Sequence, residues 1–393
     1  MKQILSIVLF ISLSKSFSQT KISGIVRDGT TKEPLAGASI FAPNTTNGGA
    51  TNQEGLFSFT LSEHQNEVLI TYVGYDNVLV PASSLANPNQ TSVIYLNPVV
   101  NQLKEVVISK MSAKEREKHL ETFKNEFIGR GKIAEQTKIV NPEVLNFQLN
   151  TEKTILTTTA DVPIVLINEK TGYEISYNLV FFESKTLKEN NFQKETVYFG
   201  YPFFKEIIAE RKLNADKISK TRQELYKGSI LHFMRSLFNN SCKKEGFTMR
   251  KFKYEPNPNY PTEETISKMW KDYKENKRSY PEIPSKYIIT HNPTYCNEEQ
   301  LIDEKENRKL LYFEDYLSVV YKNAKEETKY IFLNHLHAGN FQRSQLKITS
   351  SDPIEIFKNG SVSQPQRLAT YGYMGWKKVG ELLPFDYNPE VTP

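Results

Sequence analysis

Cysteine is scarce in this sequence: Cys242 and Cys296 are the only two in 393 residues. Two thiols 54 positions apart give neither a disulfide framework nor the ligand spacing of a zinc site. A single disulfide between them is compatible with an exported protein, and two separate thiols are the alternative.

Long apolar segments are absent beyond the first residues. After residue 18, no stretch approaches the roughly 18 consecutive apolar residues that predict a transmembrane helix. We therefore expect no transmembrane helix in the mature chain.

Charge of one sign does not dominate either. Fifty Lys and Arg residues against 45 Asp and Glu residues give a formal charge of +5, which falls to +3 without Lys2 and Lys15. The basic residues are spread along the chain, so we expect no nucleic-acid partner.

Known catalytic and nucleotide-binding motifs are also missing. There is no Gly-x-Ser-x-Gly elbow, Walker loop or dinucleotide fingerprint. The adjacent pairs Asp303-Glu304 and Glu314-Asp315 would point apart in a strand, unlike the facing carboxylates of a glycosidase. We predict no cofactor, and the sequence identifies no catalytic residue and no metal ligand.

The first 18 residues have the pattern of a secretory signal peptide. Lys2 gives a positive start, Ile4–Leu13 is mostly apolar, and Ser16 and Ser18 are small residues before a cut at Gln19. We expect an exported protein, located in the periplasm or at the outer membrane or cell surface.

Residues 19–98 contain seven short segments that alternate or are apolar, separated by turn residues. Asn47, Gly48 and Gly49 are expected to form one of the turns. So many short strands predict a β-sandwich.

Four runs in this region carry a resemblance to a known family: Gly24–Asp28, Pro34–Ile40, Thr51–Phe57 and Tyr72–Tyr75. They resemble the carboxypeptidase-regulatory-like domain, which implies a transthyretin-like sandwich without catalytic activity. That domain is common at the N-terminus of exported proteins of Gram-negative bacteria, including TonB-dependent outer-membrane receptors. Leu103–Ile108 resembles the segment that follows the domain in those receptors.

Residues 99–130 are expected to form a linker and a helix. Ser112 and Glu115 have the spacing of a capping box, and Gly129 can end the helix. Phe123 and Phe127 recur at helical spacing and predict its buried face.

Residues 131–393 are expected to form one or more β-rich domains of unknown function, with helices near 215–245. Ser229 is the expected N-cap of an apolar helix. We also expect strands at 287–290 and 330–336, and a short amphipathic helix at 376–383. The predicted fold is therefore mainly β with some α, a transthyretin-like β-sandwich followed by a β-rich region with several helices.

Four runs after the first domain resemble a group of exported bacterial proteins that carry the same N-terminal domain: Phe123–Gly129, Asn141–Leu145, Tyr226–Phe233 and Leu382–Tyr387. The resemblance extends the family and implies no activity.

Three sets of histidines have a spacing or setting that could suit a metal ligand or a base. His64 and Glu67 have the spacing of the zinc ligands of metallocarboxypeptidases, but a hairpin turn of the sandwich explains them better. His335 and His337 would share one face of a strand, and a solvated face is favoured over a metal site. For His232, a hydrogen-bonded core histidine is favoured over a base.

The remaining candidates are aromatic. Tyr371, Tyr373 and Trp376 cluster among glycines and are the predicted ligand-binding residues, because such rings stack on sugars or peptides. Core packing is the competing interpretation.

Two functional hypotheses follow. The first is a non-enzymatic envelope protein that binds or assembles with another envelope protein or a glycan through its β-sandwich. The second is a hydrolase of peptide or glycan with an unrecognised site in residues 119–393. Whether the protein is an enzyme is left open.

Overall fold

The computed structural model describes residues 20–391 with gaps at 63–64, 88–90, 100–110, 153, 187–193, 277–279 and 338. The predicted signal peptide, His64 and the segment Leu103–Ile108 lie outside the described residues. The chain forms two compact units, residues 1–104 and 105–393, and each is considered by itself.

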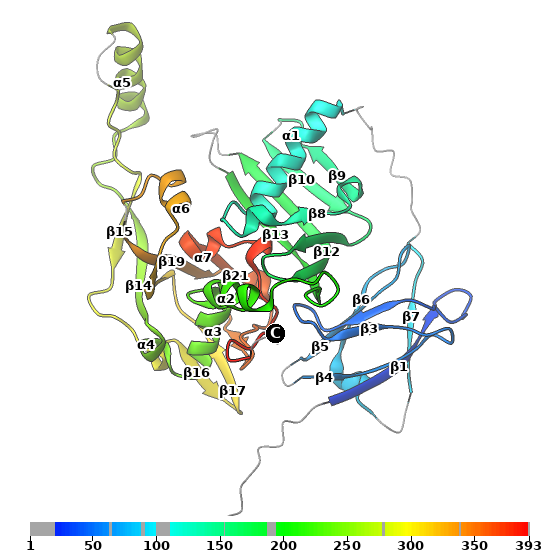
Figure 1. Ribbon diagram of the computed structural model, residues 1–393. Helices are drawn as coiled ribbons and strands as arrows, with labels where there is room; N and C mark the ends of the chain where they lie inside the picture. The colour runs from blue at the N-terminus through cyan, green and yellow to red at the C-terminus, as the bar shows by residue number, and fades with distance from the viewer. Residues whose placement is uncertain are drawn as a thin grey trace, which may run out of the picture. The chain divides into compact units, whose positions relative to one another are not determined.

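The first unit contains two small sheets (Figure 1). One sheet has the order β4-β1-β7, and the other has the order β3-β2-β5-β6. Their bounds are β1 Thr20–Asp28, β2 Ser39–Phe41, β3 Gly48–Ala50, β4 Leu56–Leu61, β5 Glu67–Thr71, β6 Val78–Pro81 and β7 Ser92–Leu96. A short 3₁₀ helix spans Ala82–Leu85.

The alternation read from the sequence sets the core of this unit. Every second residue of β1 from Ile22 to Asp28 is buried, and apolar residues of both sheets join one core cluster. The expected glycine-rich turn is wrong, because Gly48 and Gly49 pair with β2 as part of β3. The chain turns earlier instead, between Ala42 and Asn47, where the Ala42 amide donates a hydrogen bond to the Asn47 oxygen at 2.9 Å.

The second unit begins with a six-stranded antiparallel sheet of order β8-β11-β12-β10-β9, with β13 paired to the other edge of β12. The bounds are β8 Lys138–Ile139, β9 Leu145–Leu149, β10 Ile155–Ala160, β11 Ile164–Asn168, β12 Tyr173–Thr186 and β13 Lys194–Glu206. The long strand β12 pairs with β11 through its first half and with β10 through its second half.

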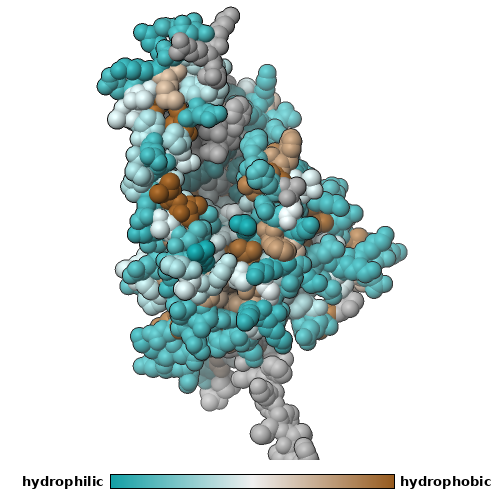
Figure 2. Space-filling view, turned by 90° about the vertical axis from the view of Figure 1, so that its left-hand side faces the viewer, coloured by the Kyte–Doolittle hydropathy of each residue, from teal (hydrophilic) through white to brown (hydrophobic). Residues whose placement is uncertain are grey.

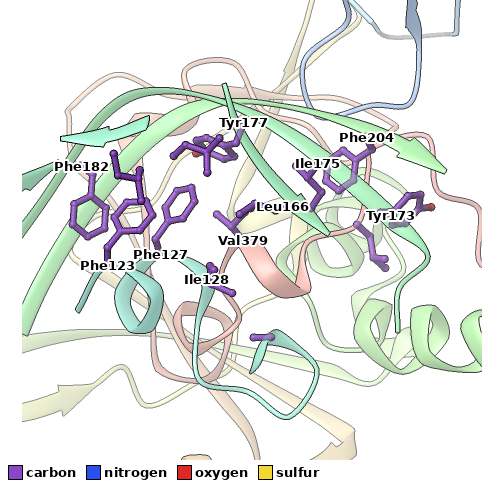
Figure 3. Close-up of a cluster of buried hydrophobic side chains, with 14 of the residues drawn as sticks. Phe123, Phe127, Ile128, Leu166, Tyr173, Ile175, Tyr177, Phe182, Phe204 and Val379 are labelled. Carbon is purple, nitrogen blue, oxygen red and sulfur yellow. The ribbon is translucent and has the colours of Figure 1, made fainter. Parts of the chain in front are cut away.

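Helix α1 (Ala113–Phe123) and the π-helical turn Lys124–Ile128 pack on this sheet. The predicted capping box at Ser112 is confirmed, and Gly129, with φ of 103°, ends the helical segment. Phe123 stacks on Phe127 with ring centroids 4.7 Å apart, and Phe127 meets Tyr177 of the sheet edge-on (Figure 3).

Three helices follow: α2 Ala215–Tyr226, α3 Ile230–Phe238 and α4 Cys242–Glu245. Ser229 caps α3 as predicted, since its side chain accepts a hydrogen bond from the His232 amide. Cys242 is buried and Cys296 is half-buried, and both are free thiols.

A second antiparallel sheet has the order β15-β14-β18-β19-β21, and a third has the order β16-β17-β20. The bounds are β14 Phe247–Pro256, β15 Tyr287–His291, β16 Ile302–Lys305, β17 Arg308–Leu311, β18 Tyr316–Lys325, β19 Phe341–Ile348, β20 Ile354–Ile356 and β21 Leu368–Tyr371. These sheets share a core with α3.

Three further helices are α5 Glu263–Asn276, α6 Thr328–Leu333 and α7 Gly372–Trp376. Short 3₁₀ turns lie at 134–136, 142–144, 298–300, 365–367 and 379–381. The C-terminal segment joins the two large cores, because Met374 packs in the core of the second and third sheets and Val379 packs in the core of the first.

Two expected elements are wrong. Residues 330–336 do not form a strand but the end of α6 and the turn after it. Residues 376–383 do not form a helix, since α7 ends at Trp376 and only Val379–Glu381 is helical again. The fold class is confirmed as mainly β with some helices, with 39% strand and 25% helix.

Candidate functional site: a basic pocket at the start of helix α2

A pocket of about 520 Å³ opens at one edge of the first sheet in the second unit. Its walls come from the segment around β8, the turn between β11 and β12, and the loop that leads into α2. Segments separated by more than 70 positions in the sequence thus contribute to one surface cavity.

Two sets of hydrogen bonds hold helix α2 in place at this pocket. Its N-cap is Asn214, whose side chain accepts from the Lys217 amide at 2.9 Å. On the inner side, the Arg222 guanidinium donates to the Thr171 oxygen at 2.7 Å and to Glu206 at 2.8 Å. Arg222 is only 3% exposed, so the helix is fixed to the turn that forms the opposite wall.

Four cationic side chains line the pocket: Lys138, Lys170, Arg211 and Lys217. Among the described residues that line the pocket, Glu169 is the only carboxylate, and its Oε1 lies 2.9 Å from Nη1 of Arg211. Within the described part of the chain, the three lysines form no ion pair. The pocket therefore carries an excess of positive charge.

The remaining lining is largely apolar. Ile139, Ile167, Leu213 and Ile218 contribute apolar side chains, and of these Ile218 is buried. The pocket also lies at the amino end of α2, where free backbone N–H groups favour negative charge. A small anionic ligand with an apolar body suits such a lining.

The predicted aromatic residues lie elsewhere and do not form one cluster. Tyr373 is 3% exposed, and its ring and that of Trp376 both contact Tyr330. Tyr371 is 43% exposed at the end of β21 and contacts Tyr316 instead. A role for the three residues in ligand binding stays a prediction, and Tyr371 is the member whose ring is accessible.

Tyr373 and Trp376 border a group of buried ionisable side chains. The Tyr373 hydroxyl donates to Oε1 of Glu327 at 3.3 Å, and Lys377 donates to the Leu225 oxygen at 3.2 Å. Burial lowers the pKa of Lys377, although Glu381 and Glu327 oppose that effect.

Glu381 is the most perturbed acid of this group. It is 4% exposed, and neither carboxylate oxygen makes a hydrogen bond within the described structure. Burial raises its pKa to about 7, and the charge of Glu327 adds to that rise. Lys377 and the amides of Ala134 and Ile133 favour the ionised form, the amides without reaching hydrogen-bond geometry.

The predicted histidines are distributed as follows. His232 is a core histidine, as favoured: Nδ1 accepts from the Gly228 amide at 3.2 Å, and Nε2 lies 3.3 Å from Glu245. The prediction of a shared strand face for His335 and His337 is wrong, because both follow α6 in a turn where His335 has a φ of 52°. No group of three His, Cys, Asp or Glu side chains within the described ranges is placed to hold a metal ion.

The two adjacent acidic pairs named in the sequence lie in different secondary structure. Asp303 and Glu304 are adjacent in β16, as expected, and each pairs with a lysine. Glu314 and Asp315 lie in a bend and not in a strand. Among the described residues, no helix is of a length and apolarity that could cross a bilayer.

The lining residues of the pocket were missed by sequence reasoning. They come from three separate segments, and each lysine alone looks like any solvated surface residue. The one local signal was Asn214, which has the character of an N-cap before α2.

Comparison with known proteins identifies the first domain. Residues 22–108 match the model of the CarboxypepD_reg-like domain family, so the chain carries a carboxypeptidase-regulatory-like domain, as its motifs predicted. A stretch of 80 residues is 32% identical to the TonB-dependent receptor SusC of Bacteroides thetaiotaomicron, covering 20% of this chain and 8% of the receptor. The chain thus matches only a small part of the length of that relative.

A crystal structure from Bacteroides fragilis, described as a membrane-associated protein of unknown function, also aligns with the chain. The alignment covers 90% of this chain and 95% of that one, at 8% sequence identity and a TM-score of 0.16. A likeness at this level carries no argument about fold or function.

Proposed function

We propose that the protein is a non-enzymatic, exported binding protein of the bacterial envelope and that the pocket at α2 binds a small anionic ligand. The excess of cations in that pocket carries the proposal. In this account residues 19–98 are the docking module, residues 99–130 are the linker and helix, and residues 131–393 hold the ligand.

The envelope location is supported by the first domain and by the N-terminal sequence. The matched relative is a TonB-dependent receptor, and residues 1–18 have the pattern of a signal peptide. Both features fit a protein that works outside the inner membrane, in the periplasm or at the cell surface.

The ligand chemistry follows from the pocket lining. Arg211 is partly neutralised by Glu169, so Lys138, Lys170 and Lys217 supply the net charge. Three ammonium groups around an apolar floor suit a carboxylate or phosphate on a compact organic body, such as an acidic sugar. A glycan partner of this kind agrees with an envelope protein.

A hydrolase is the second candidate, and the buried group around Glu381 is the observation that favours it. An acid whose pKa lies near 7 beside a buried lysine is a pattern of catalytic sites. The pocket at α2 contains none of these residues, and Glu381 is almost fully buried. The group is better explained as part of the packing between the two cores.

The test is a binding titration on the mature chain by isothermal calorimetry and NMR. Galacturonate and inorganic phosphate are the anionic probes, and galactose is the neutral one. We expect the anions to bind with dissociation constants on the order of 0.1–1 mM, as for few charged contacts on an open surface. Galactose should bind more weakly than galacturonate.

Charge reversal at the pocket sharpens the test. Lys217→Glu and Lys138→Glu should each weaken anion binding by about tenfold. Lys268→Glu is the matched control, because Lys268 is an exposed lysine of a different helix, α5. Equal binding to all three variants, or no binding of either anion to the native chain, would contradict the proposal.

A further inference from the structure

The strand β15 leaves an open edge on the second sheet of the second unit. Among the described strands it pairs with β14 alone, and all five of its residues, Tyr287–His291, are exposed. Natural edge strands are commonly protected by charged residues, proline or a bulge. The sequence Tyr-Ile-Ile-Thr-His contains no Asp, Glu, Lys, Arg or Pro, and the pairing of β15 with β14 is regular.

The edge lies on an arm that projects from the sheet. Beyond Phe252, β14 pairs with β15 and no longer with β18. Helix α5 closes the arm and has no buried residue, and Figure 1 shows it at the far end of the two strands. On the side of the molecule that carries this arm, Figure 2 shows apolar patches within a mostly hydrophilic surface.

The hydrogen bonds at the two ends of β15 show which of its residues direct their backbone N–H and C=O groups toward β14. The Asn292 amide donates to the Lys251 oxygen and the Asn257 amide donates to the Lys286 oxygen, both at 2.9 Å. Because antiparallel bonds alternate along a strand, residues 286, 288, 290 and 292 direct their backbone groups toward β14.

The backbone groups of Tyr287, Ile289 and His291 therefore face the open edge. Within the described residues these N–H and C=O groups have no backbone partner on that side. Such a row of unpaired backbone N–H and C=O groups on an exposed edge is a template for another strand.

The row is complementary to itself. An antiparallel pair of two β15 strands centred on Ile289 places Tyr287 of one copy opposite His291 of the other, and Ile289 opposite Ile289. All three pairs are of the hydrogen-bonded type, so each residue exchanges two bonds with its partner. No like charges face one another, because β15 contains no Asp, Glu, Lys or Arg and His291 would face Tyr287 of the other copy.

On both faces of the sheet, the cross-strand rows of side chains in one copy would line up with those of the second copy. Tyr254 is 41% exposed and lies opposite Ile289, which is 45% exposed. Pairing would join them to the same two residues of the second copy in one apolar row. On the other face, Glu255 lies opposite Ile288 and Lys253 opposite Thr290, so each transverse row would have an acid at one end and a lysine at the other.

We propose that the protein self-associates through β15, by antiparallel pairing of this strand with β15 of a second copy of the chain, centred on Ile289. The pairing would extend the five-stranded sheet of each copy into one continuous ten-stranded sheet. It is independent of the anion pocket, which lies in the first sheet of the same unit.

Sedimentation velocity of the full mature chain from about 5 to 500 µM tests the proposal. A five-residue edge gives a small interface, so we expect a dissociation constant on the order of 100 µM. Ile289→Pro removes an outward N–H without touching the bonds to β14, and Ile289→Lys places two ammonium groups opposite one another. Each should weaken the dimer by at least about tenfold.

The control is Val197→Lys, because Val197 is an exposed β-branched residue of a different edge strand, β13. A second measurement is disulfide formation by Ile289→Cys in a Cys296→Ser background, since residues opposite one another in a hydrogen-bonded pair lie about 5.5 Å apart at Cα. Val197→Cys in the same background should remain uncross-linked.

Three results would overturn the proposal. The chain could remain monomeric at 500 µM, it could dimerise equally well with Ile289→Pro and Ile289→Lys, or the Ile289→Cys variant could fail to cross-link under oxidation. Capture of a different protein by a monomeric chain through β15 would likewise replace self-pairing. None of these results depends on whether the pocket binds anions.

Discussion

Lys378 donates a hydrogen bond to the backbone oxygen of Glu126 at 2.8 Å, and its Nζ lies 3.4 Å from the carboxylate of the same residue. The two residues are 252 positions apart in the sequence. Lys378 follows α7, and Glu126 lies in the π-helical turn after α1. The contact fixes the C-terminal segment to the π-helical turn that packs on the first sheet of the second unit.

Replacement of this lysine should loosen that attachment. Burial lowers the pKa of Lys378, and the negative charge of Glu126 and its hydrogen bond to the ammonium oppose that effect. Lys378→Met should reduce the free energy of unfolding by about 1–3 kcal/mol. Lys274→Met on the exposed helix α5 is the control, and urea denaturation measures both. An equal change in the two variants would contradict the role of the contact.

Glu381 should make stability depend on pH. Its pKa rises from 4.5 in the unfolded chain to about 7 in the fold, so folding takes up a proton between these values. Its stabilising contribution is complete below pH 4.5, falls as the pH rises and is lost above about 7. The total change is about 3 kcal/mol at 1.36 kcal/mol per pKa unit.

The variant Glu381→Gln removes this titration. We expect it to be more stable than the native chain at pH 8 and to lose the decline between pH 4.5 and 7, as measured by urea denaturation across that range. Glu298→Gln, at a half-exposed turn, provides the comparison. Parallel pH profiles of native chain and Glu381→Gln would show that the carboxyl group titrates normally.

Gly131 lies so close to the Glu381 carboxylate that a side chain at this position would collide with it. A Cβ at this position would lie 2.6 Å from Oε1 of Glu381, closer than real contacts allow. Gly131→Ala should therefore destabilise the fold by about 1–2 kcal/mol. In a Glu381→Ala background the same substitution should be nearly neutral, which a double-mutant cycle detects. Simple additivity would exclude the proposed contact.

Arg222 connects stability with the pocket. Its guanidinium is buried over the Tyr173 ring at 3.8 Å and bonds the Thr171 oxygen and Glu206. Glu206 is half-exposed, so solvent screening limits the contribution of the ion pair. Arg222→Met should lower the free energy of unfolding by about 2 kcal/mol and weaken anion binding at α2, because that helix loses its anchor. Unchanged binding with reduced stability would separate the two effects.

Local signals predicted the parts of the fold that depend on local sequence. Ser112 and Ser229 were recognised as caps because the capping side chain needs only residues three positions ahead. Alternating and apolar segments predicted the strand-rich first unit, and in the second unit the strand expected at 287–290 is β15. The resemblance of the four runs between Gly24 and Tyr75 identified the first domain.

The errors occur where distant contacts decide the structure. Residues 330–336 are rich in apolar and aromatic residues and suggest a strand, but Tyr330 packs on Tyr373 and Trp376, and the segment turns as a helix. Long-range packing of this kind overrides local propensity.

The site was beyond sequence reasoning for the same reason. Lys138, Lys170 and Lys217 meet only because β8, the β11–β12 turn and α2 are brought together. Tyr373 and Trp376 were selected for their rings, while the perturbed acid near them, Glu381, had no motif to mark it.

The central claim is that the pocket at α2 binds a small anion. The most direct measurement is an NMR titration of the mature chain with galacturonate, repeated on Lys217→Glu. The account predicts saturable shifts confined to residues around β8, the β11–β12 turn and the start of α2, and their loss in the variant. Shifts elsewhere in the chain, or the same shifts in the variant, would contradict it.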